Sequence, residues 1–205
     1  METLAWITAL YGAVLTAAAL RWLRVPAGCS WRQVGFVVLA LLAMPVLVML
    51  LSAPEGPIGV ALWVLLEELW KIGVIKALRM GSRVAIAVCL SFAGMELIFA
   101  KALLAAFDPE MRNVGAFVWL AIVTAPVLIH AATGYVYSAL GQRSALRLLG
   151  YAFALHVTYN LVTDWFWGAG DVVAAALHLL LAGGMLFAAR RFGWRATLAP
   201  QRGLV

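Results

Sequence analysis

Seven polar residues in the apolar middle of this sequence carry side chains that acid–base chemistry can use. A carboxylate can take a proton from water that attacks a carbonyl, and an imidazole or an amide can stabilise the oxyanion that develops. In a helix, Lys71 would face Glu67 four residues before it and Glu68 three residues before it, with the acids first, which is the favourable order. We therefore expect Lys71 to form a structural ion pair with one glutamate and to leave the other for chemistry. The remaining members of the set are Glu96, His130, His156 and Asn160.

Two ways of activating water are open to these residues. In the first, Glu67 or Glu68 acts as a general base without a metal, and the sequence does not distinguish the two glutamates. In the second, His130, His156 and a carboxylate bind a zinc ion whose fourth position holds the reactive water. Ligands on separate helices leave no short signature such as HExxH, so the spacing is compatible with both.

The composition indicates what kind of protein must position these side chains. Of the 205 residues, 65% are apolar and only 12% are charged, whereas soluble domains have about half and about a quarter. A soluble fold of this size cannot bury so much apolar surface, and a mean hydropathy of +0.99 also excludes disorder. Two cysteines are too few for a disulfide-stapled scaffold. The net charge of +6 fits basic loops beside a lipid bilayer rather than nucleic-acid binding.

Apolar runs long enough to cross a bilayer recur along the chain. About 20 helical residues span about 30 Å of hydrocarbon, and seven runs reach or approach this length. We therefore predict an all-α fold, a polytopic transmembrane helix bundle that forms a single integral-membrane domain over residues 1–205. The seven predicted spans are 4–20, 34–51, 58–78, 84–104, 114–140, 148–162 and 172–189.

The basic residues predict the orientation of the bundle, because Lys and Arg collect in cytoplasmic loops. They follow the first, third, fifth and seventh predicted spans, whereas the other connections are acidic or nearly neutral. We therefore expect the N-terminus to lie outside and the C-terminus to lie in the cytoplasm. The arginines that carry this prediction are Arg21, Arg24, Arg32, Arg79, Arg83, Arg143, Arg147, Arg190, Arg191, Arg195 and Arg202.

Four of the predicted spans place a polar group at nearly the same depth. With a rise of about 1.5 Å per residue, these groups fall within about one turn of the membrane midplane. Ionisable groups at this depth are costly, so we expect them to converge on one buried polar site. Small neighbours should let the backbones approach closely there, whereas Lys101 should extend to the outer interface. The four groups are Glu67, Glu96, His130 and His156, and the small neighbours are Gly94, Ala131, Ala132 and Gly134.

The order and spacing of these residues resemble a known family. Glu67-Glu68-Leu-Trp-Lys71 is an EExxK motif, and Phe92 with Glu96 forms FxxxE. A lone histidine, His130, follows in the next span, and an HxxxN motif joins His156 to Asn160. Four such motifs in this order, over residues 58–162, resemble the PrsW family of intramembrane proteases, part of the clan of CAAX-processing and Abi-type proteases. Prenyl-protein members of that clan have FxxxH in place of FxxxE, which favours PrsW.

The resemblance implies hydrolysis of a peptide bond in a single-span membrane protein, such as an anti-sigma factor, in a bacterial inner membrane. It implies that Glu67 and Glu68 are the catalytic acids and that Asn160 stabilises the oxyanion. It also implies that Glu96, His130 and His156 bind or orient the water, or bind a metal, for which Zn²⁺ is the candidate. The substrate, the cleavage site, the pathway and the oligomeric state stay open.

Two functions outside proteolysis are compatible with the same residues. Carboxylates and histidines at the midplane also mark ion pathways, so the chain could be a proton or metal-ion conduit or a transporter. Pro45 and Pro126 lie three predicted spans apart, which fits a repeated transporter fold weakly, because no self-similarity accompanies them. A non-catalytic scaffold that binds another membrane helix is the third hypothesis.

Overall fold

The structure, a computed structural model, consists of helices. It describes residues 2–25, 27–50, 56–78, 82–107, 114–166 and 171–198. Three of the elements, α4, η1 and α5, continue one another without a break, so the described residues form seven helical rods and no strand. The prediction of an all-α fold is confirmed. The elements are α1 (Glu2–Arg24), α2 (Trp31–Leu50), α3 (Gly56–Leu78), α4 (Ser82–Glu96), η1 (Leu97–Lys101), α5 (Ala102–Phe107), α6 (Ala116–Tyr137), α7 (Ala145–Phe166) and α8 (Asp171–Leu198).

Four helices within the described residues are long and apolar enough to cross a membrane, as expected of an integral membrane protein. A shorter apolar helix, Trp31–Met44, lies within α2. The third rod, α3, coincides with a predicted span but carries Glu67, Glu68 and Lys71 at its centre, which lowers its hydropathy. The number of spans and their orientation stay predictions. The four long apolar helices are Thr3–Arg24, Arg83–Phe107, Ala116–Tyr137 and Val172–Gly193.

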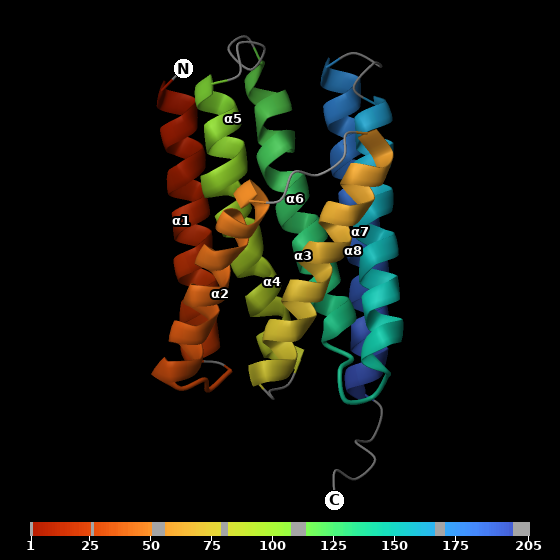
Figure 1. The fold of residues 1–205 in the computed structure, drawn as a ribbon. Coiled ribbons are helices and arrows are strands. Elements are labelled where there is room, and N and C mark those ends of the chain that lie inside the picture. The colour runs from red at the N-terminus through yellow and green to blue at the C-terminus, as the bar shows by residue number, and fades with distance from the viewer. Residues whose placement is uncertain are drawn as a thin grey trace, which may run out of the picture.

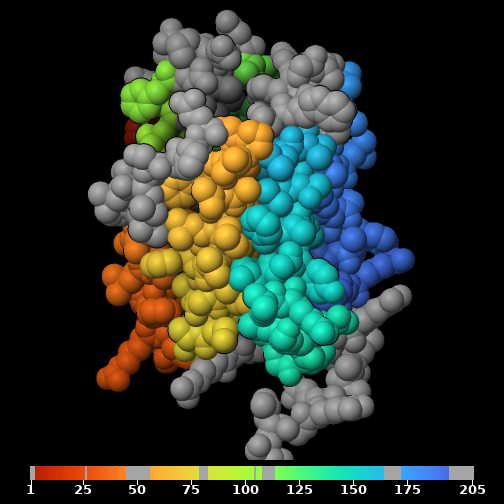
Figure 2. Space-filling view, turned by 45° about the vertical axis from the view of Figure 1, so that its right-hand side comes forward, coloured from red at the N-terminus to blue at the C-terminus, as the bar shows by residue number. Residues whose placement is uncertain are grey.

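The rods run alternately up and down in one bundle (Figure 1). The rod formed by α4, η1 and α5 packs against α1 along its length and against α6 on another side, and α6 packs against α7 and α8. Figure 2 shows α3 beside α7 on one face of the molecule, with α2 beyond α3 and α8 beyond α7. The helices that carry the polar motifs, α3, α4, α6 and α7, therefore lie next to one another.

Glycines let α4 approach two neighbouring helices closely. A Cβ atom added to Gly94 would lie 2.7 Å from the carbonyl oxygen of Gly12 in α1, so the two backbones nearly touch. A Cβ atom on Gly134 of α6 would lie 2.9 Å from the Cα atom of Ile86 in α4. Both distances exclude any larger residue without a shift of the helices. The predicted role of Gly94 and Gly134 in close approach is confirmed, and these contacts fix α4 between α1 and α6.

A π-turn interrupts the fourth rod directly after Glu96. It comprises Leu97–Lys101, and the N–H of Ala102 donates to the carbonyl oxygen of Leu97, five residues earlier. Such a turn is wider than an α-helical turn, and single π-turns inside α-helices often mark functional sites. The turn changes which side chains follow Glu96 on its own face of the rod.

Candidate functional site

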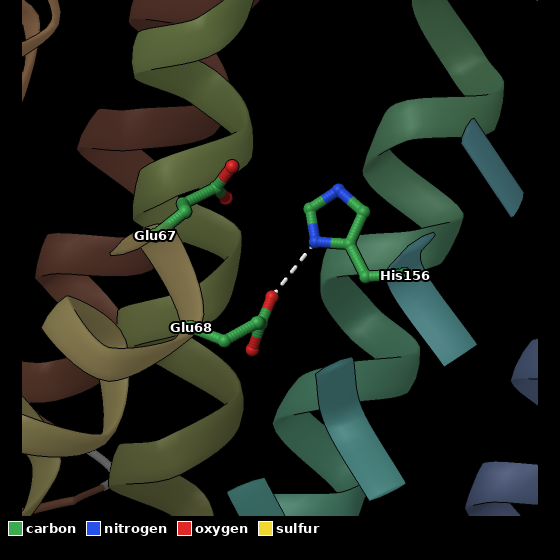
Figure 3. Close-up of side chains that lie close together, drawn as sticks. All are labelled: Glu67, Glu68 and His156. Carbon is green, nitrogen blue, oxygen red and sulfur yellow. Dashed lines mark hydrogen bonds and ion pairs between the residues drawn. The ribbon is translucent and has the colours of Figure 1, made fainter. Parts of the chain in front are cut away.

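Two glutamates of α3 face a histidine of α7 in the interior of the bundle. Figure 3 shows Glu67 and Glu68 pointing toward His156. The Nδ1 atom of His156 lies 2.8 Å from Oε1 of Glu68, so the ring donates to the carboxylate. Each of the three residues offers a ligand atom within 4.8 Å of the other two. Side chains 88 residues apart in the sequence thus meet, because α3 and α7 pack side by side.

Glu68 is buried and hydrogen-bonded on both carboxylate oxygens. Its Oε1 atom accepts from the Nζ of Lys71 at 2.6 Å as well as from His156. Its Oε2 atom accepts from the hydroxyl of Tyr137 in α6 at 2.8 Å. A buried carboxylate is stable only when it is paired and hydrogen-bonded, and Glu68 meets both conditions. This glutamate therefore joins three helices, α3, α6 and α7.

Lys71 supplies the positive charge for both glutamates of α3. Its Nζ lies 2.7 Å from Oε1 of Glu67 and 2.6 Å from Oε1 of Glu68, and its side chain is completely buried. The predicted ion pair is confirmed, but the expectation that Lys71 leaves one of the two acids unpaired is wrong, because its ammonium contacts both. Since the two carboxylates are adjacent in the sequence, this shared ammonium allows both to be ionised at the same place.

Glu67 is the less constrained of the two acids. Its side chain is 22% exposed, whereas that of Glu68 is fully buried. No described hydrogen bond or ion pair reaches its Oε2 atom, whereas its Oε1 atom is buried against the ammonium of Lys71. The Nε2 atom of His130 lies 3.6 Å from the same oxygen. Glu67 therefore keeps lone pairs that can accept a proton.

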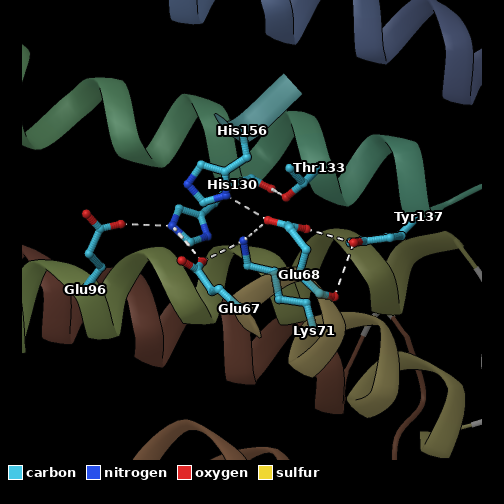
Figure 4. A network of polar contacts seen from close by, with 8 residues as sticks. All are labelled: Glu67, Glu68, Lys71, Glu96, His130, Thr133, Tyr137 and His156. Atoms are coloured by element: carbon cyan, nitrogen blue, oxygen red, sulfur yellow. Dashed lines mark hydrogen bonds and ion pairs between the residues drawn. The ribbon is translucent and has the colours of Figure 1, made fainter. Parts of the chain in front are cut away.

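His130 links Glu67 to Glu96, the last residue of α4. Its Nε2 atom lies 2.9 Å from Oε2 of Glu96, and because an ionised carboxylate can only accept, Nε2 carries the proton. Its Nδ1 atom is buried without a hydrogen-bond partner in the described part of the chain. The other oxygen of Glu96, Oε1, lies 3.5 Å from the Nζ of Lys101. Figure 4 shows the network without Lys101, with side chains from α3 and α7 meeting those from α4 and α6.

His156 has the opposite proton arrangement to His130. Its Nδ1 atom donates to Glu68, so in the neutral ring Nε2 is the bare acceptor. The two imidazole rings lie edge to face with 5.5 Å between their centroids. Two histidines with different protonated nitrogens therefore stand side by side, one held by Glu68 and the other by Glu96.

The structure brings six of the seven predicted polar residues into one network and leaves Asn160 beside it. Asn160 is half-buried one turn after His156 on α7, and its side-chain amide makes no hydrogen bond to the described residues. His178, which lies outside the predicted set, sits 3.2 Å from the carbonyl oxygen of Thr163 and against the Tyr159 ring. The convergence expected from common depth is thus observed as contacts for Glu67, Glu68, Lys71, Glu96, His130 and His156.

Two members of the network were missed by the sequence analysis. Tyr137 lies seven residues, or two helical turns, after His130, so a helical projection of α6 would have placed it on the same face. Lys101 was expected only to extend to the outer interface, and the contact of its ammonium with Glu96 was not predicted. No regular helical spacing predicts that contact, because residues five apart in an α-helix point in different directions.

The residues that could hold a metal differ from the expected set. The sequence suggested Glu96, His130 and His156, but among the described residues the group within reach of one ion is Glu67, Glu68 and His156. Glu96 lies on the far side of His130, against Lys101. The ammonium of Lys71 already contacts both carboxylates of the observed group, so a metal there would compete with a buried cation. The donor set therefore fits a metal poorly.

No family model, curated protein or solved structure matches this chain. The resemblance to the PrsW family therefore rests on the four motifs and stays a prediction. The geometry of the network is an independent observation, and its chemistry can be considered without that resemblance.

Proposed function

We propose that this protein is an intramembrane peptidase that hydrolyses a peptide bond of a membrane-anchored, single-span protein. The observation that carries the proposal is the difference between the two adjacent glutamates. Glu68 is saturated by Lys71, Tyr137 and His156, whereas Glu67 is partly exposed and contacts Lys71 and His130 through Oε1 alone, which leaves its Oε2 atom without a described partner. One acid thus organises the site, and the other is available as a general base.

The proposed reaction begins with a water molecule beside Glu67. The carboxylate takes a proton from the water while the water oxygen bonds to the carbonyl carbon of the substrate. The resulting oxyanion needs a donor, and the side-chain amide of Asn160, which is not engaged by the described residues, can supply one. When the carbon–nitrogen bond breaks, Glu67 returns the proton to the leaving amine, so atoms and charges balance.

The two histidines complete this assignment. His156 presents its bare Nε2 atom, which can accept a hydrogen bond from the attacking water and orient it. His130 donates its Nε2–H to Glu96, and the same nitrogen lies 3.6 Å from Oε1 of Glu67, which places the positive end of the N–H dipole near the base. No step in this scheme needs a metal, because Lys71 provides the positive charge beside both acids.

The proposal also includes a family and a location in the cell. The EExxK, FxxxE and HxxxN motifs support membership of the PrsW family, with an anti-sigma-factor-like protein as the substrate class. The distribution of arginines supports an orientation with the N-terminus outside and the C-terminus in the cytoplasm. We propose a bacterial inner membrane as the location on the same grounds.

One observation favours a second function, a proton conduit. Polar groups follow one another from Glu67 through His130 to Glu96 and Lys101, at 3.6, 2.9 and 3.5 Å. Chains of ionisable groups inside a membrane protein can carry protons. A conduit would need this chain but would not need the amide of Asn160.

The test compares the protein termini in membranes of cells that produce the wild type or the Glu67→Gln variant. Glutamine keeps the volume and removes the base, and Lys71 remains paired with Glu68, so the fold should survive. We expect a single-span protein that is cleaved in the presence of the wild type and intact in the presence of the variant. Glu110→Gln is the control, because the sequence places Glu110 between two predicted spans, and it should behave as the wild type.

Two outcomes would count against peptidase activity. Identical termini for the wild type and Glu67→Gln under several envelope stresses would overturn the proposal. Proton flux through reconstituted wild-type protein that Glu67→Gln abolishes, with no change in any terminus, would establish the conduit in its place.

A further inference from the structure

Lys101 and the π-turn before it lie outside the proposed reaction but contact its residues. The turn begins directly after Glu96 and ends with Lys101, whose Nζ lies 3.5 Å from Oε1 of Glu96. In an uninterrupted α-helix, residues five apart point about 140° away from each other. The wider turn brings the fifth residue back over the first, so the ion pair depends on the π-turn.

The two oxygens of Glu96 have different partners because of this turn. Oε1 faces the ammonium of Lys101, and Oε2 lies 2.9 Å from Nε2 of His130. A neighbouring positive charge favours the ionised carboxylate, which can accept a hydrogen bond but cannot donate one. Glu96 therefore holds the proton of His130 on Nε2, and Nδ1 is left bare, buried and without a described partner. Glu67, at 3.6 Å, is too far away to hold that proton by a hydrogen bond.

We propose that Lys101, placed by the π-turn, is a positioning residue that keeps His130 in its Nε2–H form through Glu96. Lys101 has no described contact with His130 and acts on it only through the carboxylate of Glu96. If Lys101 loses its charge, the partly buried carboxyl group of Glu96 is expected to take up a proton. It then donates to Nε2, and the ring proton moves to Nδ1.

The consequence for catalysis rests on the proposed function. With the proton on Nε2, the hydrogen bond goes to Glu96, but the positive end of the N–H dipole also lies 3.6 Å from Oε1 of Glu67, which favours an ionised carboxylate there. With the proton on Nδ1, a bare nitrogen would face the carboxylate, and two acceptors would repel each other. Loss of Lys101 should therefore lower the turnover number and leave substrate binding nearly unchanged, because the base is affected and the contacts with the substrate are not.

The experiment measures the protonated ring nitrogen of His130 by ¹⁵N nuclear magnetic resonance on full-length protein in lipid nanodiscs. The chain has three histidines, so a His130→Gln sample identifies the signal. We expect an Nε2–H ring in the wild type and in Lys101→Arg, and a shift toward Nδ1–H in Lys101→Met. Lys76→Met is the matched control, because Lys76 is exposed near the end of α3, outside the network, and should leave the signal unchanged.

The same samples separate this inference from the proposed peptidase activity. An unchanged Nε2–H signal in Lys101→Met overturns the positioning role whether or not the protein cleaves a substrate. Lys101→Gln, which is polar but uncharged, decides the question if the methionine variant does not fold. If Lys101→Met shifts the signal and the wild type cleaves no substrate, the positioning role is supported and the peptidase activity is refuted. Where proteolysis is present, we expect about a tenfold or larger fall in kcat for Lys101→Met, with KM nearly constant and recovery in Lys101→Arg.

Discussion

The polar network has a tight half and a loose half. The tight half is centred on Glu68, whose contacts with Lys71, His156 and Tyr137 span 2.6 to 2.8 Å. Both oxygens of this carboxylate are occupied, and its side chain is fully buried. The carboxylate of Glu68 therefore has no oxygen left for a substrate or a water molecule among its described contacts, and these contacts tie α3, α6 and α7 together.

The loose half is centred on Glu96 and His130. Its ion pair with Lys101 is 3.5 Å long, and His130 lies 3.6 Å from Glu67. The side chains of Glu96 and Lys101 are 30% and 27% exposed, and Nδ1 of His130 has no described hydrogen-bond partner. The comparison indicates that the tight half stabilises the bundle and that the loose half is free to react. The two adjacent glutamates differ in the same way, since Glu68 belongs to the tight half and Glu67 is the proposed base.

Removing the charge of the tight half should have the largest effect on stability. Lys71→Met leaves two carboxylates without their shared cation, and breaking a buried ion pair costs about 3–5 kcal/mol. We expect little folded protein from Lys71→Met and more from Lys71→Arg, which keeps the charge. The measurement is the yield of monodisperse protein after detergent extraction. Equal yields of the two variants would show that the tight half does not hold the bundle together.

Removing one hydrogen bond from the tight half should have a smaller effect. Tyr137→Phe deletes the donor to Oε2 of Glu68 and leaves a buried acceptor unsatisfied, which costs about 1–3 kcal/mol. We expect a lower thermal midpoint in detergent but a folded protein. Tyr151→Phe is the control, because that side chain is half exposed and packs its ring against Phe192, and it should stay within about 0.5 kcal/mol of the wild type. If Tyr137→Phe is as stable as the control, the hydrogen bond from Tyr137 to Glu68 does not contribute to the stability of the tight half.

Metal removal should have the smallest effect of all. Because Lys71 occupies the position between the two carboxylates, we expect no stoichiometric zinc in the wild type, in His130→Ala or in His156→Ala. Elemental analysis of purified membranes or nanodiscs measures this directly. A stoichiometric metal that is lost from His156→Ala would contradict the comparison, since the tight half would then contain a binding site.

Much of the fold follows from the hydrophobic pattern, because a membrane span needs a long apolar run whatever its neighbours are. Each of the seven predicted spans overlaps a described helical rod. The convergence of Glu67, Glu96, His130 and His156 also follows from their common depth, since isolated charges are costly in hydrocarbon. Gly94 and Gly134 were expected to allow close packing, and both do.

The details of the site depend on local geometry that no periodic pattern contains. The π-turn inserts a wider turn after Glu96, and only this geometry turns Lys101 toward the network. The choice between Glu67 and Glu68 depends on the position of Tyr137 on another helix. The group of described residues within reach of one ion differs from the expected metal set for a related reason. Spacing along the chain gives the depth of a ligand but not the direction in which its side chain points.

The sharing of Lys71 by two acids also sets a charge balance for the whole network. Three carboxylates, those of Glu67, Glu68 and Glu96, face two ammonium groups, so with neutral histidines the network has one negative charge in excess. A single added positive charge, whether a proton or a primary amine at the end of a peptide, would bring the balance to zero. A doubly charged cation would instead leave the network with one positive charge in excess. In the proposed reaction, the amine released by cleavage is a group of this kind, so small alkylamines are natural first inhibitors to screen.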